Sequence, residues 1–186
     1  MTNKERYINL LKQTNRQGID DLINWLESTD FFDAPASTKY HNSKPGGLLE
    51  HSLNVFHELD YDLKNSNFIF PDESILIVSL LHDICKADFY IETTRNVKKD
   101  GKWYQEPYYS VDDREPLGHG EKSVILAMKY INLTDLEIAA IRWHMGGFES
   151  KENYNSISKT YSENPLALYL HIADLKATYL VESDEK

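Results

Sequence analysis

Apolar residues recur at every third or fourth position along most of this chain, which is the spacing of helices that bury one face. The clearest case begins at Leu48, where Leu49, Leu53, Phe56 and Leu59 share one helical face. One later segment is apolar nearly all round, which places it at the centre of a bundle. The pattern predicts about seven helices: residues 5–13, 19–29, 48–63, 72–87 (the central one), 120–131, 136–145 and 165–181.

Residues that favour helix starts support three of these boundaries. Pro71, with acids after it, and Pro165 both stand where proline suits the first turn of a helix. Thr134 is expected to cap the next helix, with Glu137 completing a capping box. The polar stretch SKENYNSISKTYSEN, residues 150–164, is expected to form a surface loop.

A different pattern interrupts the helices in the middle of the chain. The segment FYIETTRNVKKDGKWYQEPYYSVDD is rich in Tyr, Thr and Val and carries an Asp100-Gly101 turn. These features predict a β-hairpin with strands near residues 91–97 and 102–108. The expected fold class is therefore all-α, with one β-hairpin inserted near residues 90–110.

Length and composition fit one domain over residues 1–186, with a core at 31–180, N-terminal helices at 1–30 and the inserted hairpin and loop at 90–118. The formal net charge of −10 argues against a strongly basic nucleic-acid-binding surface, although a local basic patch stays open.

The single cysteine, Cys85, excludes an internal disulfide framework. We see neither an apolar leader nor a run of the roughly 20 apolar residues that a membrane span needs. A cytoplasmic protein without membrane association is expected.

Three ionisable residues interrupt the most apolar helix. The stretch LLHDICK places His82, Asp83 and Lys86 beside the apolar run SILIVSLL. Burying such groups is costly unless they are paired or bind a metal. On a continuous helix, His82 and Asp83 would point about 100° apart, and Lys86 would share their face. Lys86 taken alone could equally be a solvent-facing lysine at a helix end.

Histidines and aspartates also recur in the other apolar segments. A single histidine on an apolar helix is more often a satisfied core or surface residue than a ligand. Here four of the seven histidines and two aspartates lie on five separate segments, which facing helices of a bundle could bring together. Imidazole and carboxylate suit Mn, Fe, Co, Ni or Zn. We therefore predict a site for a divalent transition metal, with these candidate ligands: His51, His82, Asp83, His119, His144 and Asp174.

The order His, His-Asp, Asp resembles the signature of the HD superfamily of metal-dependent phosphohydrolases. The stretches GGLLEHSLNV around His51, LLHDICK around His82 and HIADLKAT around Asp174 are similar to the motifs of that family. His119 in PLGHGEKS and His144 in IRWHMGG resemble the extra ligands of its two-metal branch.

This resemblance, over roughly residues 31–180, implies an HD-type helical bundle and a phosphohydrolase activity. It implies that Asp83 bridges two metal ions, and that a metal-activated water attacks phosphorus. The other ligands of the first ion would be His51, His82 and Asp174, and those of the second would be His119 and His144.

The resemblance also implies a small phosphorylated substrate, a nucleotide or a short nucleic acid, with no stable binding of duplex nucleic acid. Lys86 would work beside Asp83 as a catalytic residue by binding phosphoryl oxygens. Homo-oligomer formation stays open. Weaker candidates for substrate contacts are Lys122, Arg142, His41 and His171.

The stretch FFDAPASTKYHNSKPGGLLEH resembles the beginning of HD domains of the 3′-to-5′ exoribonuclease type. This sequence departs from those proteins because it carries no OB-fold domain, which argues against processive RNA degradation. Two other functions remain open. HD-fold di-iron oxygenases use the same six ligands with iron and O₂, and some HD domains bind nucleotides without catalysis. Intact ligands and Lys86 favour a hydrolase over a non-catalytic domain.

Overall fold

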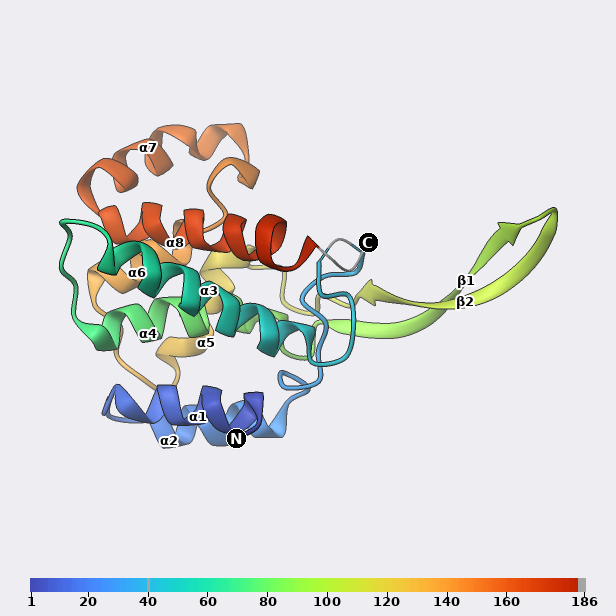
Figure 1. Ribbon diagram of the computed structural model, residues 1–186, viewed down its shortest axis with the longest axis horizontal. Helices are drawn as coiled ribbons and strands as arrows, with labels where there is room; N and C mark the ends of the chain where they lie inside the picture. The colour runs from blue at the N-terminus through green and yellow to red at the C-terminus, as the bar shows by residue number, and fades with distance from the viewer. Residues whose placement is uncertain (40, 184–186) are drawn as a thin grey trace.

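The computed structural model describes residues 1–39 and 41–183, and in these parts it contains eight α-helices and one two-stranded hairpin. An all-α bundle with one inserted β-hairpin, as the sequence predicts, is thereby confirmed (Figure 1). The elements in chain order are α1 (Asn3–Gln13), α2 (Ile19–Ser28), α3 (Gly47–Lys64), α4 (Asp72–Leu81), β1 (Tyr90–Lys99), β2 (Lys102–Val111), α5 (His119–Met128), α6 (Asp135–Trp143), α7 (Tyr154–Glu163) and α8 (Pro165–Lys176).

Helix α4 forms the centre of the bundle. Every residue from Ser74 to Leu81 is buried, as expected for a segment that is apolar on all sides. Helices α1, α3 and α6 pack around α4, and α8 packs against both α3 and α6. The Lys176 ammonium at the end of α8 lies 2.5 Å from the Asp62 carboxylate of α3. This pair helps to fix the end of α8 against α3.

Two sequence predictions about helices are wrong. The stretch 150–164, expected to be a surface loop, contains α7, because the buried Ile157 and the partly buried Tyr161 give it an apolar side that packs against α8. The helix expected over 72–87 stops at Leu81, since Asp83 has non-helical dihedral angles (φ −112°, ψ 15°) before a short 3-10 turn. The chain therefore leaves the helix at the two residues with the most specific chemistry.

The hairpin extends away from the helices (Figure 1). Its strands pair from Tyr90 opposite Val111 to Lys99 opposite Lys102, so they are longer than the sequence predicts. The turn residues Asp100 and Gly101 both have positive φ angles, 50° and 79°. Two positive φ angles are what a two-residue type I′ hairpin turn needs. No helix of the described part of the chain is long and apolar enough to cross a membrane.

A buried ion pair joins the segment between α1 and α2 to the start of α6. The fully buried Glu137 carboxylate accepts hydrogen bonds from the Arg16 guanidinium at 2.9 and 3.1 Å and from the Ser74 hydroxyl at 2.7 Å. It also accepts from the backbone N–H of Thr134 at 2.8 Å, which completes the predicted capping box. Glu137 therefore connects three segments of the bundle.

Replacing Arg16 with Met should lower the free energy of unfolding by about 3 kcal/mol, because it leaves the Glu137 carboxylate buried without its cation. Burial raises the pKa of Glu137, but the hydrogen bonds from Arg16, Thr134 and Ser74 lower it by more. The pKa of Glu137 therefore lies below its usual value. A lowered folded-state pKa contributes stability above the unfolded-state pKa that is lost as the pH falls. The difference in free energy of unfolding between the wild type and the Arg16→Met variant should therefore decrease as the pH falls. Urea denaturation at neutral and acidic pH measures both effects.

Lys12→Met is the matched control, because the ion pair of Lys12 with Asp20, at 3.8 Å, is exposed. Exposed pairs contribute at most about 1 kcal/mol. Equal losses in the two variants would contradict a structural role for the buried pair.

Candidate metal centre

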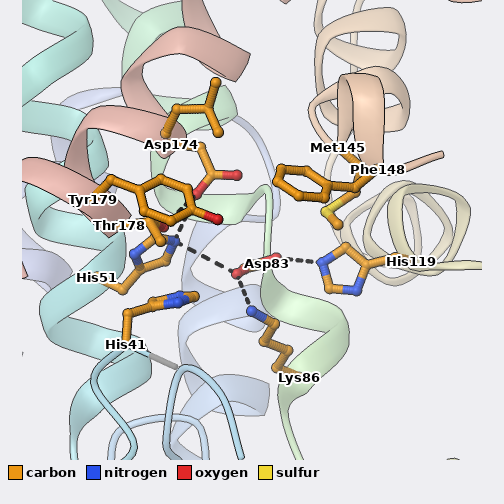
Figure 2. Close-up of a pocket in the computed structure, with 11 residues that line it drawn as sticks. His41, His51, Asp83, Lys86, His119, Met145, Phe148, Asp174, Thr178 and Tyr179 are labelled. Atoms are coloured by element: carbon orange, nitrogen blue, oxygen red, sulfur yellow. Dashed lines mark hydrogen bonds and ion pairs between the residues drawn. The ribbon is translucent and has the colours of Figure 1, made fainter. Parts of the chain in front are cut away.

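The six predicted ligands come together from five segments of the bundle, and four of them line one pocket. Helix α3 supplies His51, and α8 supplies Asp174. The bend after α4 supplies His82 and Asp83. His119 is the first residue of α5, and His144 is the residue that ends α6. Figure 2 shows four of the six around the pocket: His51, Asp83, His119 and Asp174.

The position of two histidines at helix ends fixes their tautomers. His82 and His144 follow the last residues of α4 and α6, where backbone carbonyls have no partner within the helix. The Nδ1 atom of His82 donates to the carbonyl of Ser79 at 2.8 Å, and that of His144 donates to the carbonyl of Ile141 at 2.6 Å. A carbonyl only accepts, so Nδ1 carries the proton. Each Nε2 therefore presents a lone pair to the site.

A buried lone pair of this kind is stabilised by a hydrogen-bond donor or by a metal ion. The Nε2 atom of His144 is buried and has no hydrogen-bond partner among the described residues. The Nε2 atoms of His82 and His51 are 3.4 Å apart, so one metal ion at about 2.1 Å from each nitrogen could contact both. A histidine that donates from one nitrogen to a carbonyl while the other faces inward has the arrangement of a metal ligand. These residues fit a metal ion on the chemistry of their donor atoms.

His51 lies between two carboxylates. Its Nε2 is 3.2 Å from Asp174 Oδ1, and its Nδ1 is 3.1 Å from Glu182 Oε1. Burial lowers the pKa of His51, but the carboxylates of Asp174 and Glu182 outweigh burial and raise it to about 10. Glu182 also accepts a hydrogen bond from the amide of Asn54 at 2.9 Å. Glu182 thus orients His51 from the side away from the pocket.

Asp83 is the centre of the cluster, because its two oxygens face different groups. Oδ1 lies 2.5 Å from His119 Nε2 and 3.6 Å from His144 Nε2. Oδ2 lies 2.7 Å from Lys86 Nζ and 3.8 Å from His51 Nε2. Burial raises the pKa of Asp83, but Lys86, His82 and His119 together hold it well below its usual value. Asp83 is therefore ionised and can contact cations on two sides.

Close packing of α5 on α6 brings the two remaining histidines together. A Cβ atom on Gly120 would lie 2.2 Å from the carbonyl oxygen of Arg142, so only glycine permits this approach. The ring centroids of His119 and His144 are consequently 5.2 Å apart. The buried Cys85 thiol lies 3.4 Å from His119 Nδ1 and is one more potential ligand. The described residues form four groups of three that could hold a metal ion, and one of these contains Asp83, Cys85 and His119.

Lys86 keeps its charge in this buried setting. Its ammonium contacts Asp83 Oδ2 at 2.7 Å and donates to the backbone carbonyl of Ala36, also at 2.7 Å. Burial lowers the pKa of Lys86, but Asp83 raises it above its usual value. The side chain points into the pocket (Figure 2). A fixed positive charge therefore lies beside the cluster of ligands.

The pocket has a volume of about 460 Å³, which is within the size range of small-molecule sites. His41 lines it with its ring 4.9 Å from that of His51, and both His41 ring nitrogens are buried without a partner among the described residues. Burial, His51 and Lys86 lower the pKa of His41 to about 4. The apolar part of the lining, which we call the apolar wall, consists of Met145, Phe148, Leu175 and Tyr179.

Three of the weaker candidates from the sequence have other partners and do not line this pocket. Lys122 pairs with Asp113 at 2.8 Å. Arg142 contacts Glu149 at 2.8 Å and also pairs with Glu121. His171 donates from Nδ1 to the backbone carbonyl of His144 at 2.7 Å. His171 therefore supports the backbone at a ligand and does not face the pocket.

Sequence reasoning missed Glu182, Cys85, Phe148 and Tyr179. Glu182 follows Asp174 by eight residues, and nothing in the sequence separates it from the other acids near the end of the chain. Cys85 did have a signal, because it lies two residues after Asp83 in a buried segment and thiolate is a metal ligand. The two aromatic residues could be found only once the pocket was known.

No family model, no curated protein and no solved structure matches this chain.

Replacing Glu182 with Gln should weaken metal binding by about 10- to 100-fold, the usual effect of removing the hydrogen-bond partner of a ligating histidine. A neutral amide holds the Nδ1 proton of His51 less strongly and makes Nε2 a poorer donor to a metal. Competition of the protein with a chelator for Zn²⁺ measures the affinity. Glu50→Gln, at a half-exposed carboxylate on the same helix as His51, is the control. Equal affinities in the two variants would remove Glu182 from the site.

Proposed function

We propose that this protein is a metal-dependent phosphohydrolase of the HD type that acts on a nucleotide or a short nucleic acid. The observation that carries the proposal is the position of Asp83. One of its oxygens faces His119 and the other faces Lys86, at the base of a pocket of about 460 Å³. Metal ions and a separate fixed positive charge both stabilise the charge that develops in phosphoryl transfer.

The ligands divide into two groups that share Asp83. We propose that His51, His82 and Asp174 hold one divalent transition metal ion with Asp83, and that His119 and His144 hold a second with it. When bound, the ions would lower the pKa of a water molecule and neutralise charge on the phosphate. Each histidine would bind through the nitrogen that faces the cluster.

Lys86 would bind the phosphoryl group. Its raised pKa means that it keeps its protons at neutral pH, so it donates hydrogen bonds without exchanging a proton. The carbonyl of Ala36 and the carboxylate of Asp83 hold the ammonium in place before a substrate arrives. A charge positioned in advance stabilises the transition state without reorganisation.

The apolar wall supports a nucleotide as the substrate. Phe148 and Tyr179 line the pocket and remain 64% and 56% exposed, so a ligand in the pocket could contact their rings. Figure 2 shows their rings on the two sides of Asp174. A nucleobase is planar and stacks on such rings. We infer that the base lies against this wall while the phosphate lies near Lys86.

Hydrolysis of phosphate esters under argon with added Mn²⁺ tests the proposal. The panel contains mononucleotides, cyclic and linear dinucleotides, a short RNA and ribose 5-phosphate, which lacks a base. We expect release of phosphate or cleavage of a phosphodiester, with a lower KM for substrates that carry a base. Absence of activity on every substrate would contradict the proposal. Consumption of O₂ by the iron-loaded protein would then indicate an oxygenase.

A further inference from the structure

The hairpin Tyr90–Val111, which we call the arm, is longer than packing explains. Its ten paired positions span about 33 Å, and none of its residues is buried. It extends away from the helices (Figure 1). A two-stranded hairpin without a core is only marginally stable in water. A projecting hairpin of this length therefore needs a role other than stability.

The outer half of the arm is basic although the chain is acidic. Between Arg95 and Glu106 there are four basic and two acidic residues, whereas the whole chain has a net charge of −10. Lys99 pairs with Glu106. In the described parts of the chain, no ion pair engages the other three cations, which are Arg95, Lys98 and Lys102. This distribution favours an anionic partner at the arm and repels it from most of the remaining surface.

Aromatic rings lie beside two of these cations, and one of the rings is exposed. Lys98 Nζ is 5.9 Å from the ring centroid of Trp103, which is 68% exposed. The Arg95 guanidinium is 5.5 Å from the ring centroid of Tyr108. Strand alternation places these two pairs on opposite faces of the arm. Cations beside aromatic rings suit a single-stranded nucleic acid, whose phosphates bind cations and whose unpaired bases stack.

The base of the arm is joined to the pocket. The Tyr90 hydroxyl donates to the backbone carbonyl of Ala36 at 3.4 Å, and the same carbonyl accepts from Lys86 Nζ at 2.7 Å. A second hollow of about 410 Å³ lies along the lower part of the arm, with Arg95 and Tyr108 in its lining. Arg95 and Tyr108 therefore line a hollow on the arm, and Tyr90 at its base shares a backbone carbonyl with the lysine at the pocket.

We propose that the arm binds single-stranded nucleic acid and directs one end of the strand to the pocket. The second part of this proposal rests on the proposed function, whereas binding by the arm does not. A duplex is a poorer partner, because its bases are already stacked and cannot reach the rings. An acidic surface on a second copy of the chain would satisfy the cations but would leave the exposed rings unused.

Equilibrium binding of a labelled single-stranded oligonucleotide of about 12 nucleotides tests the proposal without metals, by fluorescence anisotropy in EDTA. Trp103→Ala should weaken binding about tenfold through the loss of stacking. Replacing Arg95, Lys98 and Lys102 together with Gln should weaken it further. The triple variant should also reduce the slope of log affinity against log salt by about 2.

A triple variant of equal charge change, with Gln at the exposed Lys129, Lys151 and Lys159, is the control. It should change the affinity by less than about twofold. The proposal would be overturned by no binding at low salt, by equal losses in both triple variants, or by tighter binding of a duplex than of the single strand. A change from dimer to monomer in the arm variants, without a loss of binding, would identify the arm as a contact between copies and would also overturn it.

Hydrolysis assays separate the two proposals. If the arm leads to the pocket, the wild type should cleave an oligonucleotide with a lower KM than a dinucleotide, and the arm variants should lose this difference with kcat unchanged. Binding without hydrolysis of any substrate would contradict the proposed function and leave the arm as a binding element. Hydrolysis with no preference for longer substrates would contradict the proposal that the arm directs a strand to the pocket. It would leave the proposed function intact.

Discussion

Asp83→Asn should remove the bound metal and lower phosphate-ester hydrolysis by roughly a thousandfold or more, since metal ions contribute several kcal/mol to transition-state stabilisation. Both oxygens of Asp83 are used, one toward His119 at 2.5 Å and one toward Lys86 at 2.7 Å. An amide has the same shape but no charge, and one of its two positions is an N–H donor that cannot bind a cation. Elemental analysis of the purified variant measures the metal directly.

The control for this variant is Asp113→Asn, since Asp113 pairs with Lys122 outside the pocket. It should retain full metal content and full activity. Circular dichroism shows whether each variant is folded, so that loss of metal is not confused with loss of structure. Full metal content in folded Asp83→Asn protein would contradict the central position assigned to Asp83.

Lys86→Met should lower kcat by about 100-fold while the metal content stays at the wild-type level, which separates the role of Lys86 from that of the ligands. Methionine keeps much of the apolar length of the side chain but cannot donate to a phosphoryl oxygen. Asp83 loses its cation in this variant but keeps the contact with His119, so some loss of stability is also expected. Steady-state kinetics and elemental analysis on the same preparation provide the two readouts.

Lys159→Met, at an exposed lysine of α7, is the matched control and should leave both quantities unchanged. A parallel loss of metal and activity in Lys86→Met would show that this lysine only supports the site. A kcat equal to that of the wild type would exclude Lys86 from contact with the phosphate.

Much of the fold could be predicted from the sequence, because it depends on local features of the chain. The period of apolar residues predicts α3 and α4, and the Thr134 capping box predicts the start of α6 within one residue. The Asp100-Gly101 turn predicts the hairpin. Helix α7 could not be predicted, because only Ile157 of its residues is buried and its polar residues form a helix through packing on α8.

The ligand types and their order along the chain were visible in the sequence, since a histidine or an aspartate inside an apolar run is a local exception. The partner of each ligand was not visible. Lys122 and Arg142 stand close in sequence to His119 and His144, yet their charges are directed to Asp113 and Glu149. Lys86 likewise stands within a few residues of candidate ligands, but its ammonium contacts one of them, Asp83.

The amino-acid sequence alone thus specified an all-α bundle with a hairpin and six candidate ligands. The tertiary structure decided which nitrogen of each candidate histidine faces the cluster of ligands and that Glu182 contacts His51. It also decided that Asp83 stands where the chain leaves α4. The physical reason is the separation in sequence of the residues that interact. Helix formation depends on residues three or four positions apart, whereas contacts such as that between His51 and Glu182 depend on how α3 and the end of α8 pack.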